Sequence, residues 1–298
     1  MEYKDFGGEG PPLIVIQGAH NYFDQSSSSP YWQHEKKSFI EFYTKLAEHN
    51  KVLAPLKRGF GRTSPQLEED NVQTATEELI LLMDKLEIEK AFFLGRDVPA
   101  QNMLYLAEHF PDRVLGLIFI QPVFVRTEIK DDATKDFVYH NYSQSYKASE
   151  YKEFKFKLSQ QAYRPQIYKD STLSINIPAL LFYHAKYSEE TLEMRRLERF
   201  ISWVESTKKI EWNKEYSSPE RAHFFEKLSK DKKRMYHIRD YLVDNNPIPK
   251  MNASLKRAFG NNLVVFNESL LQVNDVRTAL LNVSYPVIKA FLFMTSEE

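Results

Sequence analysis

Cysteine is absent from the sequence, and its absence excludes disulfide bonds, thiolate metal sites and cysteine nucleophiles together. Eight histidines are present, but they are dispersed, and no His-x-x-x-His or similar spacing of metal ligands occurs. The phosphate-binding Gly-x-Gly-x-x-Gly and P-loop patterns are missing as well. We therefore expect neither a metal site nor a cofactor.

An excess of one charge is also lacking. Forty Lys and Arg stand against forty-one Asp and Glu, a net charge of −1, so we expect no nucleic-acid or membrane partner and favour a small-molecule substrate or ligand. No apolar run is long enough for a membrane helix, and the nearest candidate, 285–294, contains Pro286 and Lys289. The polar, glycine-rich residues 1–10 show no secretory signal, so the expected compartment is the cytoplasm.

What is present is enough apolar sequence for a large core. The chain has 298 residues, of which 42% are hydrophobic and 14% aromatic, so it can form one large domain or a core with a small lid. Apolar segments typical of buried strands alternate with segments of helical periodicity. We expect strands within 11–18, 52–55, 91–94, 115–120, 177–183 and 209–212, and helices within 38–48, 74–86 and 103–107. This alternation predicts a mostly parallel sheet flanked by helices.

The stretch 91–101 is the most informative part of the chain. Its apolar run breaks at Gly95 into a turn that opens an amphipathic segment, which predicts a strand, a sharp turn and a helix. The middle residue of such a turn is Asp97. It would lie at the carboxyl end of the sheet, near helix N–H groups that favour negative charge. The plainer alternative is that Asp97 only caps the helix that follows.

The spacing Gly95-x-Asp97-x-Pro99 resembles the nucleophile elbow of α/β-hydrolases, with an aspartate as in the haloalkane dehalogenase and epoxide hydrolase branch. The resemblance implies that the Asp97 carboxylate attacks a carbon that bears a leaving group, and that water then cleaves the enzyme ester. Pro99 replaces the second glycine of the family pattern, a change that the first turn of a helix tolerates. The resemblance is strongest over 11–122, where Lys57 to Thr63 are similar to the family's glycine-containing loop.

The same resemblance implies an oxyanion hole and a histidine base. The backbone N–H groups of Val98 and Ala19 would receive developing negative charge. His223 lies in a stretch similar to the family's Gly-His-Phe-x-x-x-Glu signature, after an expected last strand at 209–212, and it follows the nucleophile in chain order. We therefore predict that His223 is the general base.

The acid of the triad is less clear, because both usual positions carry uncharged residues, Tyr187 and Gln121. Glu189 is the shifted candidate that we name as catalytic, with Glu190 and Glu128 as alternatives. Arg96 could pair with Asp97 and reduce its availability as a nucleophile. The expected substrate-binding residues are Gln17, His20, Arg96, Gln121, Tyr142 and Tyr146.

The two tyrosines come from a segment that resembles the family's lid, where epoxide hydrolases use tyrosines to protonate the epoxide oxygen. We expect an α/β-hydrolase core at 1–122 and 177–244, a lid at 123–176, and a C-terminal extension at 245–298 that packs on the core. The extension contains an expected strand at 262–267 and a helix at 273–283, and it could fill or cover a vacant sheet edge.

Two functions stay open. One is a hydrolase that acts on an epoxide, alkyl halide or ester through Asp97 and His223. The other is a catalytically inactive protein of the same fold that binds a ligand or a protein partner.

Overall fold

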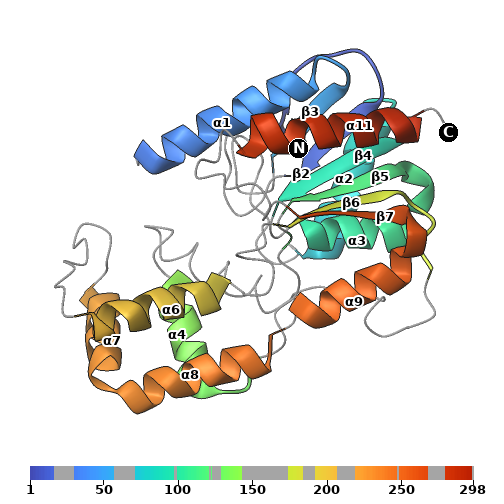
Figure 1. Ribbon diagram of the computed structural model, residues 1–298. Coiled ribbons are helices and arrows are strands. Elements are labelled where there is room, and N and C mark those ends of the chain that lie inside the picture. Colours follow the sequence, from blue (N-terminus) through green and yellow to red (C-terminus); the bar gives the residue numbers. More distant parts are fainter. Residues whose placement is uncertain are drawn as a thin grey trace. The chain divides into compact units, whose positions relative to one another are not determined.

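The computed structural model describes residues 1–16, 30–56, 71–96, 99–120, 122, 129–142, 174–183, 192–206, 219–246, 248–267 and 279–296 (Figure 1). The chain forms two compact units. The first, here called the α/β unit, comprises Met1–Val125, Tyr163–Ser188 and Lys250–Glu298. The second, here called the helical unit, comprises Arg126–Ala162 and Glu189–Pro249. Each unit is thus built from separate stretches of the chain.

The α/β unit contains a seven-stranded sheet in the order β1-β3-β2-β4-β5-β6-β7. Strand β1 is antiparallel to β3, and every other neighbouring pair is parallel. The strands are β1 Tyr3–Asp5, β2 Pro12–Ile16, β3 Lys51–Pro55, β4 Ala91–Arg96, β5 Val114–Ile120, β6 Ala179–Tyr183 and β7 Leu263–Asn267. Its main helices are α1 Pro30–Leu46, α2 Val72–Lys85, α3 Ala100–His109, α9 Ile248–Phe259 and α11 Tyr285–Ser296.

Helices cover both faces of this sheet, which explains why the central strands are apolar throughout. On one face, Phe93 and Leu117 pack in a cluster with residues of α2, α3 and α9, including Phe259. On the other face, Phe92 and Ile118 pack with residues of α1 and α11. Alternate residues of each strand therefore pack against different helical layers.

The short connections between these elements include one-turn helices at Pro111–Arg113 and Gly260–Asn262 and a π-helical turn at Ala279–Ser284 before α11. In α11, Phe291 and Leu292 are buried against the sheet. The segment 285–294 is thus a packed surface helix of the α/β unit. Within the described part of the chain, no helix has both the length and the apolar character needed to cross a bilayer.

The helical unit contains α4 Asp132–Tyr142, α6 Leu192–Glu205, α7 Pro219–Lys230 and α8 Lys232–Asp244. Each helix contributes apolar side chains to a shared cluster, among them Phe137, Phe200, Leu228 and Ile238. The cluster contains no strand residue, so these helices pack on one another around a core of their own. This core joins α4, from the first stretch of the unit, to α6, α7 and α8, from the second.

These boundaries correct the expected division of the chain. Residues 189–244 were assigned to the sheet core, but their amphipathic helices bury their apolar faces against α4 in the helical unit. The C-terminal extension does more than pack on the core, because it supplies β7, which pairs with β6 at the edge of the sheet opposite β1. The expected strand at 209–212 lies outside the described residues.

Most of the other expected elements are confirmed. Strands β2 to β6 coincide with the predicted apolar runs, and α2 and α3 begin and end close to the predicted positions. Helix α1 begins at Pro30, earlier than its apolar stripe indicated.

Candidate active site

The predicted strand and helix are present as β4 and α3. Strand β4 ends at Arg96, and Pro99 directly precedes α3 with a φ of −52°, a value that suits the start of a helix. The Pro99 carbonyl accepts a hydrogen bond of 3.1 Å from the backbone N–H of Met103. Only residues 97 and 98 separate the described parts of the strand and the turn. The position of Asp97 in the sequence is therefore that of the turn.

Gly95 allows the helix to return close to the strand. A Cβ atom at this position would lie 2.6 Å from Met103 Sδ and 2.9 Å from Pro99 Cβ, both closer than real contacts allow. Pro99 cannot easily retreat, because its ring is fixed to the backbone. The first glycine of the Gly-x-Asp-x-Pro pattern is thus explained by close packing between strand and helix.

The carboxyl end of β4 also lies where the order of the strands in the sheet reverses. From β2 the chain passes through α1 to β3 on one side, while β4 is the neighbour of β2 on the other side. Ile16 of β2 pairs with Gly95 of β4, so both strands end at the same level of the sheet. In open α/β sheets, ligands bind outside the carboxyl ends of the strands at such a switch point.

Among the expected site residues of the α/β unit, Arg96 is the one whose side chain the structure describes. Its guanidinium carbon lies 5.1 Å from the centre of the Phe39 ring, over a residue of α1. Contacts of this kind attract a cation to the face of the ring. The guanidinium therefore packs on the α1 side of the sheet.

Two buried polar residues of α3, Gln101 and Asn102, were not predicted. Asn102 is 4% exposed and donates hydrogen bonds to Thr76 Oγ1 at 3.1 Å and to the Val72 carbonyl at 3.4 Å. These bonds tie α3 to α2. Gln101 is 8% exposed in the first turn of the helix. Two adjacent amides in the first turn of a mostly apolar helix were the sequence signal that could have identified them.

His223 lies in the helical unit, on α7, and its side chain is exposed. Its selection as the base depended partly on an expected last strand at 209–212, but the last strand of the sheet in chain order is β7, which follows His223. No hydrogen bond joins its ring to another residue in the described part of the chain. The strand expected before His223 lies outside the described residues, and the catalytic role of His223 stays a prediction.

The remaining predicted site residues cannot be placed. Tyr142 is the last residue of α4, and its side chain is not among those described. Outside the described residues lie Asp97, Val98, Ala19, Gln17, His20, Gln121, Glu189 and Tyr146.

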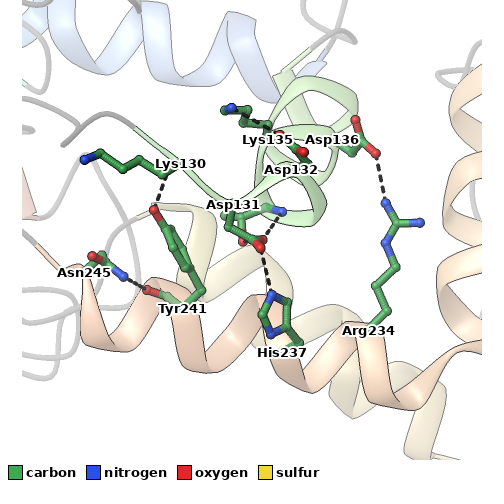
Figure 2. A network of polar contacts seen from close by, with 10 residues as sticks. Lys130, Asp131, Asp132, Lys135, Asp136, Arg234, His237, Tyr241 and Asn245 are labelled. Carbon is green, nitrogen blue, oxygen red and sulfur yellow. Dashed lines mark hydrogen bonds and ion pairs between the residues drawn. The ribbon is translucent and has the colours of Figure 1, made fainter.

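The helical unit contains a second cluster of polar side chains, which joins α4 to α8 (Figure 2). Asp131, just before α4, accepts a hydrogen bond from the backbone N–H of Thr134 at 2.7 Å, and its other oxygen lies 2.8 Å from His237 Nε2. Arg234 pairs with Asp136 at 2.9 Å, and Tyr241 accepts a hydrogen bond from the backbone N–H of Lys130 at 2.9 Å. We call three of these contacts, Asp131–His237, Asp136–Arg234 and Lys130–Tyr241, the α4–α8 clasp.

The Asp131–His237 pair differs from a catalytic pair, because the Thr134 hydroxyl donates to Asp131 and, among the described residues, no hydroxyl is hydrogen-bonded to the imidazole of His237. Burial acts to raise the pKa of the Asp131 carboxyl, but hydrogen bonds from His237 and Thr134 outweigh it and hold that pKa below the ordinary value. The clasp is therefore a structural connection. Among the described residues, no group of three or more His, Asp or Glu could hold a metal ion.

Comparison with solved structures identifies the architecture as the α/β-hydrolase fold. An alpha/beta hydrolase from the metagenome of sediments of the lagoon of Mar Chica, Morocco, has a TM-score of 0.52 and 13% identity, over 99% of this chain and 95% of that chain. The enol-lactonase from Burkholderia xenovorans has a TM-score of 0.50 and 13% identity, over 98% of this chain and 96% of that chain. An N-acyl homoserine lactone degrading enzyme has a TM-score of 0.50 and 13% identity, over 97% and 96%. The sequence matches no model of a known family.

Proposed function

We propose that the protein is a hydrolase that acts on a small organic substrate, an epoxide, alkyl halide or ester, with Asp97 as its nucleophile. The observation that supports this most directly is the close packing of Pro99 and Met103, at the start of α3, on Gly95 of β4, with an aspartate in the sequence between strand and helix. The turn lies at the switch point of the sheet, where ligands of open α/β sheets bind. The likeness to hydrolases of the same fold is consistent with this function.

In the proposed reaction, a carboxylate oxygen of Asp97 forms a bond to the substrate carbon while the bond from that carbon to the epoxide oxygen or halide breaks. The backbone N–H groups of Val98 and Ala19 stabilise developing negative charge on the ester carbonyl in the second step. Tyr142 or Tyr146 would supply a proton to the epoxide oxygen. Water then attacks the ester carbonyl, and the alcohol and the free carboxylate are released.

The second step needs a base. His223, oriented by Glu189, is the candidate that the sequence favours, because it follows the nucleophile in chain order. The strand order adds another candidate, because His184 follows β6 directly in the sequence, and the carboxyl ends of parallel strands share one edge of a sheet.

Mass spectrometry of the intact protein tests these assignments. Wild-type protein should turn over members of a panel of epoxides, alkyl halides and esters, and Asp97→Asn should lower the rate by about a thousandfold or more. The variants His223→Gln and His184→Gln identify the base. The variant that lacks the base should accumulate a covalent adduct on the peptide that contains Asp97. Unchanged turnover in Asp97→Asn would contradict the proposal.

A non-catalytic binding protein is the second candidate, favoured by one observation. The family places its histidine after the last strand of the sheet, and residues 268–278, which follow β7, contain no histidine. If the panel gives neither turnover nor adduct, while one of its members raises the thermal unfolding temperature, the protein is a binder.

A further inference from the structure

The two edges of the sheet differ in how they are protected against pairing with another chain. Strand β1, at one edge, has three residues, and two of them, Lys4 and Asp5, are charged and exposed. Strand β7, at the other edge, has five residues, and none of them is charged (Figure 1). Short length and charged side chains are common means by which natural sheets prevent edge-to-edge association. Strand β1 has this protection, and β7 lacks it.

The valines of β7 are exposed on both faces of the sheet. Val264 is paired with Leu180, which belongs to the apolar cluster on the side of α1 and α11, and it is 49% exposed. Val265 is paired with Leu181, which belongs to the cluster on the side of α2, α3 and α9, and it is 42% exposed. Val15, within the same sheet, is 1% exposed. The apolar surface of β7 is therefore only half covered.

The ring contacts of the covering helices involve inner strands. Phe291 of α11 packs on Phe92 of β4, with ring centres 6.4 Å apart, and Phe259 of α9 packs on Phe119 of β5 at 6.5 Å. In the described part of the chain, β7 is paired with β6 alone. Its backbone N–H and C=O groups that point away from β6 have no strand partner there, and such groups readily pair with another strand.

The geometry of β7 suits pairing with a second copy of itself. Two identical strands related by a two-fold axis perpendicular to the sheet run antiparallel, and every residue keeps its face. Opposite residues must then belong to the same face, so the axis passes through a residue and not between two. An axis at Val265 is the choice that pairs all five residues. It places Val265 opposite its own copy and Val264 opposite Phe266 of the second copy.

The charge of the strand favours the same occupant. Like charges that lie directly opposite each other on antiparallel strands are destabilising, and a contact between identical strands brings each charge near its own copy. The strand from Leu263 to Asn267 carries no charge, so this penalty does not arise. A pair of an aromatic and a β-branched residue, such as Phe266 and Val264, is a favourable cross-strand pair. A charged peptide, in contrast, would find no charge of opposite sign on β7.

We propose that β7 is a self-association surface, through which two copies of the chain pair antiparallel about a two-fold axis at Val265 and form one continuous sheet. This inference goes beyond the proposed function and does not depend on it. Five residues a side are fewer than the 20–30 or so of a standard interface, so the dimer should be weak and dissociate at micromolar concentrations.

Cysteine substitution tests the register, because the chain has no cysteine of its own. In the proposed dimer, residue 265 lies about 5 Å from its copy, within reach of a disulfide. Residue 264 and its copy are diagonal neighbours about 8 Å apart, which is too far. Under mild oxidation, Val265→Cys should form covalent dimers at least tenfold faster than Val264→Cys, whose side chain is similarly exposed. Equal rates in the two variants would overturn the proposed pairing.

Sedimentation analysis of the full chain tests the association itself. Wild-type protein should show a monomer–dimer equilibrium between about 1 and 200 µM. Val265→Lys and Val265→Glu each place like charges opposite each other, so each variant alone should be monomeric, with an unchanged circular dichroism spectrum. An equimolar mixture of the two should regain the dimer, because the opposed charges then attract. A mixture that stays monomeric would overturn the central position of Val265.

Val243→Lys is the matched control, since Val243 is a similarly exposed valine on α8 of the helical unit. This variant should keep the wild-type equilibrium. A dimer that persists in Val265→Lys would place the interface elsewhere and overturn the inference. A wild-type monomer over the whole range would also overturn it, and hydrogen exchange of the β7 amides would then show whether the chain's own residues cover the edge. None of these results decides whether Asp97 is a nucleophile, which turnover and adduct formation test separately.

Discussion

The α/β unit and the helical unit differ in the interactions that stabilise each of them internally. In the α/β unit, the strands are buried on both faces, and the helices are fixed by large apolar clusters around Phe92 and Phe93. In the helical unit, a smaller apolar core is accompanied by the α4–α8 clasp, whose charged and hydroxyl groups are partly exposed. Stability of the first unit should therefore depend mainly on packing, and that of the second also on caps and ion pairs.

The largest expected effect comes from the sheet core. Phe93 is 0% exposed in the middle of the sheet, so Phe93→Ala should lower the free energy of unfolding of the α/β unit by about 3–5 kcal/mol. Hydrogen exchange should show faster exchange of the β4 and β5 amides. The matched variant is Phe137→Ala, which removes a buried ring from the helical core. It should accelerate exchange in α4, α7 and α8 and leave β4 and β5 unchanged. Equal acceleration in both units by either variant would show that they unfold together.

A smaller effect is expected from the clasp. Asp131→Ala removes both the cap of α4 and the partner of His237, and should lower the free energy of unfolding of the helical unit by about 1–2 kcal/mol. Asp231 is a suitable control, because it caps α8 through the backbone N–H of Arg234 at 2.9 Å and has no histidine partner. Asp231→Ala should cost about 0.5–1 kcal/mol in the same urea titration. The same loss in both variants would mean that the contact with His237 contributes nothing.

The smallest effect concerns pH. The pKa of Asp131 is lower in the folded protein than in the unfolded chain, so the unfolded state takes up the proton first as pH falls. Its contribution to stability is complete above the unfolded pKa, near 4, and is lost as pH falls through the folded value. Urea midpoints followed by exchange in α4 and α8 should fall below about pH 4. Asp131→Asn should remove this component, and an unchanged pH dependence in that variant would contradict its assignment to Asp131.

The sheet could be predicted because its sequence signal is local. Apolar runs such as Phe92 to Leu94 leave few choices other than a buried strand, and their alternation with helices defines a parallel sheet. The partner of an amphipathic helix is not a local property. The helices α6, α7 and α8 have apolar faces that suit a sheet or another helix equally well, so only the structure shows that they pack in one cluster with Phe137 of α4.

The same distinction applies to the candidate site. The turn that follows Gly95 could be predicted, because a strand, a glycine and a helix follow one another within a few residues. The relation of this turn to His223 depends on distant parts of the chain: the strand expected before His223, at 209–212, lies outside the described residues, and β6 pairs with β7.

The position of β7 also affects how the protein is synthesised. Strand β6 leaves the ribosome long before its neighbour, because residues 184–262 must be made between Tyr183 and Leu263. Until then, Ala179 to Tyr183 form a sheet edge of five uncharged, mostly apolar residues, the kind that joins strands of other chains. We therefore expect the nascent chain to be open to edge-to-edge association of β6 while α6, α7 and α8 are being translated.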